Sequence, residues 1–178
     1  MTPEVEQQVL TALRGDSVAK QHAFRLLFDS LRKSVTATCL HITGGEAEAQ
    51  DAAQEAFIAI HQALPRFREE AKLSTWALQI AVHVALRTRR RQRADEPIEE
   101  AAHVADRGLS PEHGAEGRQL GRRLSLAISK LSAEQRAVLA LFAVEGLSQK
   151  DIAEILVIPE GTVWSRLHAA RKRLQELL

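Results

Sequence analysis

Two short helices joined by a tight turn are predicted between residues 147 and 173, where the sequence reads LSQKDIAEILVIPEGTVWSRLHAARKR. Ser148 and Asp151 have the spacing of a capping box, so the first helix is expected to begin directly after Ser148. Pro159 ends that helix, because proline lacks an amide proton and biases the residue before it away from the helical conformation. A turn of about three residues between two amphipathic helices is typical of a helix-turn-helix.

The second helix of this pair is expected to carry its polar groups on one side. Val163 and Leu167 lie four residues apart and predict an apolar stripe that packs on the first helix. The outward set is Thr162, Trp164, Ser165, Arg166, His168, Arg171 and Lys172. Hydroxyls and a guanidinium suit base edges and cations suit phosphates, so we predict a helix that binds in a DNA major groove. A basic helix face that is only solvated would give the same pattern.

Charge divides the chain into three blocks. Residues 1–93 have 13 basic residues (Lys and Arg) and 10 acidic residues (Asp and Glu), a net charge of +3. Residues 94–116 have 1 basic and 7 acidic residues, a net charge of −6. Residues 117–178 have 10 basic and 6 acidic residues, a net charge of +4. The acidic block holds two prolines and two glycines, and helical periodicity lapses there. We therefore predict an all-α chain with two small helical domains, 1–93 and 117–178, joined by a flexible acidic linker, 94–116. The second domain is expected to hold four helices, including the helix-turn-helix.

The first domain is expected to hold four helices. The third has an acidic and amide-bearing outer face that includes Asp51, Gln54, Glu55 and Gln62. The fourth is expected to be capped by Ser74 or Thr75.

Five arginines end that fourth helix, at positions 87, 89, 90, 91 and 93. Cations at a helix C-terminus complement the macrodipole, but five predict phosphate contacts as well. Lys72 and Trp76 lie at the other end of the same helix. Two interpretations fit Trp76, a base-stacking platform or a core residue.

Several classes of protein have little support. No apolar run is long enough to span a membrane and the N-terminus lacks a signal-peptide pattern, so we expect a cytoplasmic protein. Cys39 is the only cysteine, which excludes an intramolecular disulfide, and we expect it to be a small buried helix residue. The histidines are scattered, and no nucleophile and base pair or phosphate-cradling loop stands out. We therefore expect no enzyme activity, no metal, no cofactor and no small-molecule substrate.

Three segments together resemble the sigma-70 family of bacterial RNA polymerase initiation factors, in its extracytoplasmic-function group. They are DAAQEAFIAIHQALPRF, STWALQIAVHVALRTRRR and LSAEQRAVLALFAVEGLSQKDIAEILVIPEGTVWSRLHAARKRL. The first resembles the family's polymerase-docking segment, the second its minus 10 helix and the third its minus 35 domain.

The resemblance implies a polymerase subunit that directs promoter-specific initiation, with core RNA polymerase, promoter DNA and an anti-sigma protein as partners. It assigns core binding to Asp51, Gln54, Glu55 and Gln62, and minus 35 binding to the outward set of the last helix. It assigns minus 10 binding to Lys72, Trp76, His83, Arg87, Arg90 and Arg91. The alternative is a helix-turn-helix regulator that acts without docking on core polymerase.

The chain departs from the family pattern at three places. Leu78, Gln79, Val82 and His83 replace the family's usual aromatic, basic or amide residues. Val157 stands where the family usually has a glycine, and a β-branched residue is strained if the backbone there needs a positive φ. Trp164 stands where a lysine is common, and its flat side chain is expected to meet either DNA or an inhibitory protein.

Overall fold

The computed structural model describes residues 1–95 and 115–178, with side chains for 1–92 and 119–178. Within these residues every regular element is a helix, so the all-α prediction is confirmed. The predicted linker lies outside the described residues except at its ends, where residues 94, 95, 115 and 116 belong to the flanking helices.

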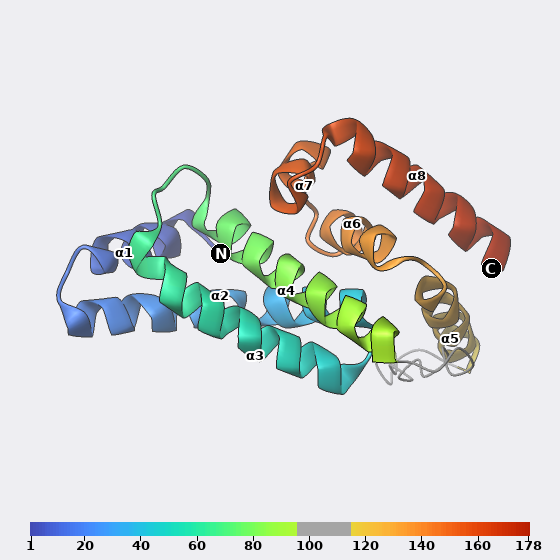
Figure 1. The fold of residues 1–178 in the computed structure, drawn as a ribbon, viewed down its shortest axis with the longest axis horizontal. Helices are drawn as coiled ribbons and strands as arrows, with labels where there is room; N and C mark the ends of the chain where they lie inside the picture. The colour runs from blue at the N-terminus through green and yellow to red at the C-terminus, as the bar shows by residue number, and fades with distance from the viewer. Residues whose placement is uncertain (96–114) are drawn as a thin grey trace.

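The first half is built from four α-helices and one turn of 3-10 helix (Figure 1). Their bounds are α1 Pro3–Leu13, α2 Ser17–Thr43, α3 Glu46–Ala63, η1 Leu64–Arg66 and α4 Leu73–Asp95. The three long helices α2, α3 and α4 contact one another pairwise, and α1 packs on α2. Alanines at the α3 contacts, such as Ala49, Ala52 and Ala56, let these helices approach closely and are fully buried.

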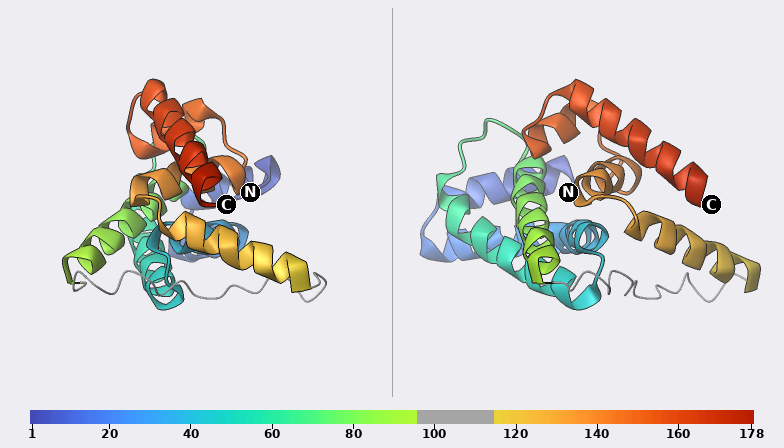
Figure 2. Two further views of the ribbon diagram at one scale, coloured as in Figure 1. Left: turned by 90° about the vertical axis from the view of Figure 1, so that its right-hand side faces the viewer. Right: turned by 45° about the vertical axis from the view of Figure 1, so that its right-hand side comes forward.

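The second half contains α5 Ala115–Ser129, α6 Ala133–Ala143, α7 Gln149–Leu156 and α8 Glu160–Leu177. The helices α6, α7 and α8 contact one another, and α5 contacts α8 (Figure 2). Val163, Leu167 and Ala170 form the buried stripe of α8, as their spacing predicts. The predicted helix-turn-helix therefore corresponds to α7 and α8.

Two helix starts in the second half follow their local sequence. Ser132 caps α6 and Ser148 caps α7. In each case the amide of the capping serine donates in return to the side chain of Gln135 or Asp151, which completes the capping box. Each box satisfies backbone amides that a helix N-terminus otherwise leaves without partners.

The start of α4 is different, and the expectation that Ser74 or Thr75 caps this helix is wrong. The helix begins at Leu73, and the amide of Leu73 donates to Glu6 Oε1 of α1 at 2.5 Å. A second contact joins the same regions, since Arg14 Nη2 lies 2.9 Å from Glu69 Oε1. The helix is capped by a residue 67 positions away in the sequence, which no local pattern could indicate.

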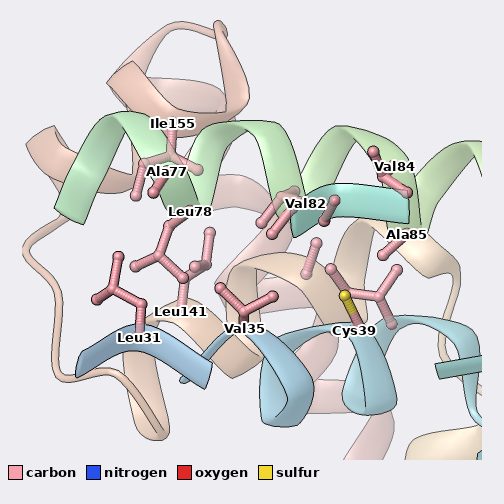
Figure 3. Close-up of a cluster of buried hydrophobic side chains, with 14 of the residues drawn as sticks. Leu31, Val35, Cys39, Ala77, Leu78, Val82, Val84, Ala85, Leu141 and Ile155 are labelled. Carbon is pink, nitrogen blue, oxygen red and sulfur yellow. The ribbon is translucent and has the colours of Figure 1, made fainter. Parts of the chain in front are cut away.

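The two halves share one apolar core. Helix α6 contacts α2 and α4, and α7 contacts α4. Leu141 of α6 lies near Leu31 and Val35 of α2 and Leu78 of α4, and Ile155 of α7 lies beside Ala77 of α4 (Figure 3). All of these side chains are at most 4% exposed.

Cys39 belongs to this core, as expected for a small buried helix residue. Burial raises the pKa of its thiol to about 12. The thiol is therefore protonated and unreactive near neutral pH.

Candidate nucleic-acid interface

All seven residues of the predicted groove-binding set lie on helix α8. Trp164, Ser165, His168, Arg171 and Lys172 are exposed, whereas Thr162 and Arg166 are half-buried. The helix lies at the outer edge of the second half, so this side is open to a ligand (Figure 1).

Neighbouring side chains orient several of these groups. The rings of Trp164 and His168 are stacked, with centroids 5.3 Å apart and an interplanar angle of 9°. The guanidinium of Arg171 lies 5.1 Å from the ring centroid of Phe142 on α6. These contacts restrict rotamers before a ligand binds, which reduces the entropy lost on binding.

In the turn before α8, Val157 has the left-handed backbone that a β-branched residue disfavours, as the sequence indicated. Its φ and ψ are 54° and 50°, in the left-handed region that favours glycine. The side chain is 70% exposed, so little packing offsets the strain. The left-handed residue lets the amides of Val157 and Ile158 bond back to carbonyls of α7, and it redirects the chain into α8.

Helix α4 carries the predicted minus 10 residues, with Lys72 directly before its first residue. Lys72, His83, Arg87, Arg90 and Arg91 are exposed.

Trp76 is half-buried, and its ring packs on Phe67 with centroids 5.1 Å apart. The indole therefore belongs in part to the core, and its accessible part leaves base stacking as a prediction.

Two cations of α4 are paired with carboxylates. Arg87 forms an ion pair with Glu55, one of the predicted core-binding residues on α3. Arg90 Nη2 lies 3.8 Å from Glu134 Oε1 on α6.

Glu134 also interacts electrostatically with Arg166 on α8. Burial alone would raise the pKa of Glu134, but hydrogen bonds from its own backbone amide and from Ser132, together with the charges of Arg90 and Arg166, lower the pKa overall. One carboxylate therefore interacts with a predicted minus 10 residue and a predicted minus 35 residue.

The predicted docking face on α3 is divided between two environments. Asp51, Gln54 and Gln62 are exposed, and Glu55 is half-buried. Gln54 and Gln62 line a groove of about 1060 Å³ between α2 and α3, whereas Glu55 is turned to α4 through its ion pair.

Each half of the chain matches the model of a known protein family. Residues 27–94 match the model of sigma-70 region 2, and residues 121–174 match the model of sigma-70 region 4. The RNA polymerase sigma-H factor of Pseudomonas aeruginosa is 33% identical over 189 aligned positions, which cover all of this chain and 96% of the relative. The chain belongs to the sigma-70 family. Its relatives place it in the extracytoplasmic-function (ECF) group of RNA polymerase sigma factors.

Further relatives carry the group's name. The ECF sigma factor SigW of Bacillus subtilis is 29% identical, covering 98% of this chain and 96% of its own length. The ECF sigma-E factor of Escherichia coli is 30% identical, covering 98% and 95%.

Two solved structures share the fold of this sigma factor. CnrH in complex with the cytosolic domain of CnrY superposes with a TM-score of 0.65 and 22% identity, covering 97% of this chain and 95% of CnrH. The sigma factor RpoE of Bartonella quintana, in complex with the anti-sigma factor NepR, gives a TM-score of 0.62 and 22% identity, covering 99% and 97%.

Two features of this sigma factor were not found by sequence reasoning. One is the apolar wall of the α2–α3 groove, where the ring of Phe28 packs on Phe57 and the ring of Phe24 packs on Phe28. The signal in the sequence was Ile58, an apolar residue among the polar residues of the outer face of α3. The other is the pairing of Glu134 with Arg90, because in the sequence Glu134 is an ordinary acidic residue in the first turn of a helix.

The described part of this sigma factor contains no helix that is long and apolar enough to cross a membrane. Among the same residues, no three histidine, cysteine, aspartate or glutamate side chains lie close enough together to hold a metal ion.

Proposed function

We propose that this sigma factor binds core RNA polymerase through α3, the minus 10 element through α4 and the minus 35 element through α8. The exposed cations on α4 and α8 carry the proposal, because each set lies along one helix and suits a phosphate backbone. The protein acts in the cytoplasm as a polymerase subunit without catalysis of its own. An anti-sigma protein is proposed to control it, since RpoE of Bartonella quintana has such a partner.

The two proposed DNA-binding helices offer different chemical groups to DNA. On α8, Ser165 and Arg166 offer a hydroxyl and a guanidinium to base edges, while Arg171 and Lys172 offer cations to phosphates. On α4, the arginines at 87, 90 and 91 follow one strand's phosphates, and the accessible part of Trp76 stacks on an unpaired base.

Transcription with purified components tests the proposal. Core polymerase is mixed with the protein and a promoter library, and the initiated transcripts are sequenced. Specific initiation that requires the protein is expected. A protein that binds DNA but neither binds core polymerase nor initiates would support the alternative of a regulator without core docking.

The core-binding face is tested by charge reversal that spares the Glu55–Arg87 ion pair. Asp51→Arg with Gln54→Arg is expected to weaken core binding by about tenfold or more, since like charges at an interface are strongly unfavourable. The matched control is Asp29→Arg with Gln21→Arg, which replaces an exposed acid and an exposed amide on α2 and so adds the same charge away from the α3 face. Equal core affinity of the two double variants, with unchanged helical content, would refute this assignment.

A further inference from the structure

The loop that leads into α4, residues 67–72, is attached to α1 at two points (Figure 1). Directly after the loop, the amide of Leu73 donates to Glu6 Oε1 at 2.5 Å. Within the loop, Glu69 Oε1 lies 2.9 Å from Arg14 Nη2. Glu6 and Arg14 are eight positions apart in the sequence, which is about 12 Å along a helix, so the two attachments are well separated.

The two attachments act in different ways. The carboxylate of Glu6 accepts a charge-assisted hydrogen bond from a part-buried amide, which fixes the end of the loop and the first turn of α4. The side chains of Arg14 and Glu69 are 70% and 47% exposed, so their ion pair contributes little stability by itself. However, Glu69 has φ 58°, a left-handed backbone that a residue with a Cβ rarely adopts. Its tie to α1 favours this unusual backbone over the more common conformations.

The same loop places two of the groups proposed to meet the minus 10 element. Lys72 is its last residue, and the Lys72 carbonyl accepts from the amide of Trp76 at 3.0 Å. Phe67 is its first residue, and the ring of Phe67 packs on the ring of Trp76 with an interplanar angle of 51°. The conformation of the loop therefore determines where the Lys72 side chain begins and which part of the indole stays accessible.

Helix α1 lies outside the part of the chain that the family models match. The match to sigma-70 region 2 covers residues 27–94, so both Glu6 and Arg14 precede it. Neither residue belongs to the sets predicted to bind DNA or core polymerase. Both bond to the loop, so an effect of these residues on DNA binding passes through the conformation of the loop.

We propose that Glu6 and Arg14 are positioning residues for minus 10 recognition, because they hold the loop that places Lys72 and Trp76. In the held loop, the accessible part of Trp76 stacks on an unpaired base while Lys72 meets a phosphate. The physical basis is preorganisation, since a loop that is already ordered loses less entropy when DNA binds. This inference rests on the function proposed above.

An abasic scan tests this role in the whole protein bound to core polymerase. A single-stranded minus 10 oligonucleotide, taken from a promoter that initiates with this protein, is compared with copies that each lack one base. The affinity for the intact strand divided by the affinity for an abasic strand is the reading ratio of that base. Stacking on an aromatic side chain accounts for roughly five- to 150-fold per base, so the wild type should show a reading ratio of about five or more at one position. The base on the indole is the one whose ratio falls most in Trp76→Leu.

Glu6→Ala with Arg14→Ala is expected to lower the reading ratio of that base by about threefold or more. The matched control is Glu4→Ala with Arg25→Ala, which removes the same two residue types from exposed positions on α1 and α2 and should keep the ratio. A purely structural role of Glu6 and Arg14 would weaken the binding of intact and abasic strands equally. A reading ratio that stays at the wild-type value, or that falls equally in the control, would therefore overturn the inference.

A charge exchange tests the ion pair separately. Arg14→Glu is expected to lower the reading ratio, and Arg14→Glu with Glu69→Arg is expected to restore it, because the exchange re-forms the pair and keeps the net charge. A ratio that stays low after the exchange would remove Arg14 from the positioning role. If the wild type initiates from the promoter but no base has a raised ratio, no base is stacked and the inference is wrong. If the wild type does not initiate, the proposed function itself is wrong.

Discussion

Replacing Val157 by glycine is predicted to be far less harmful than the same replacement at Val144. Both valines are exposed, at 70% and 52%, and both follow the last residue of a helix. Val157 has φ 54°, whereas Val144 has φ −97°. Only Val157 therefore carries the strain of a left-handed backbone.

The magnitudes follow from this difference. A left-handed conformation costs a residue with a Cβ about 1–2 kcal/mol. Glycine loses about 0.5–1 kcal/mol more than other residues through backbone entropy, and removing a partly buried valine side chain costs about 0.5 kcal/mol. Val144→Gly should therefore lower the free energy of unfolding by roughly 1–1.5 kcal/mol, while Val157→Gly should change it by between about −0.5 and about +1 kcal/mol.

Urea and thermal unfolding of the two variants measure this difference. A gap of about 1–2 kcal/mol corresponds to roughly 2–8 °C between the melting temperatures of the two variants. If Val157→Gly loses as much stability as Val144→Gly, the left-handed turn stores no strain and the reasoning fails.

Three further outcomes are expected. Arg171→Ala should lower the slope of log affinity against log salt for minus 35 DNA by about one phosphate contact, whereas Arg171→Lys should keep it; an unchanged slope in the alanine variant would exclude a phosphate contact. Glu6→Ala should cost about 0.5–2 kcal/mol of unfolding free energy because it removes the acceptor for the Leu73 amide, and Glu6→Gln, which keeps an acceptor, should cost less. The lowered pKa of Asp151 means that its cap stabilises the fold above the ordinary carboxyl pKa and that this stability is lost as pH falls through the lower folded value. Acid titration should therefore show a smaller loss of stability below about pH 4 in Asp151→Asn than in the wild type.

Local physics made much of the fold predictable. The capping boxes at Ser148 and Ser132, the proline after α7 and the apolar stripe of α8 each depend on residues within a few positions of one another. The placement of the polar set on the outer side of α8 follows from the same periodicity.

Contacts between distant residues could not be predicted in this way. Ile155 of α7 is fully buried and lies beside Ala77 of α4, a contact between residues 78 positions apart in the sequence. The cap of α4 by Glu6 and the pairing of Arg90 with Glu134 likewise depend on how whole helices are placed. An exposed cation and a paired cation have the same sequence signature.

The apolar core shared by the two halves is completed late during synthesis of the chain. Leu141 follows Asp95, the last residue of α4, by 46 positions. At about 5–20 residues per second, the ribosome needs roughly 2–9 s to make that stretch. For that interval Leu31, Val35 and Leu78 lack the side chain that covers them in the finished protein. Each newly made molecule therefore exposes apolar surface on α2 and α4 for that time, until α6 leaves the exit tunnel and can pack on these helices.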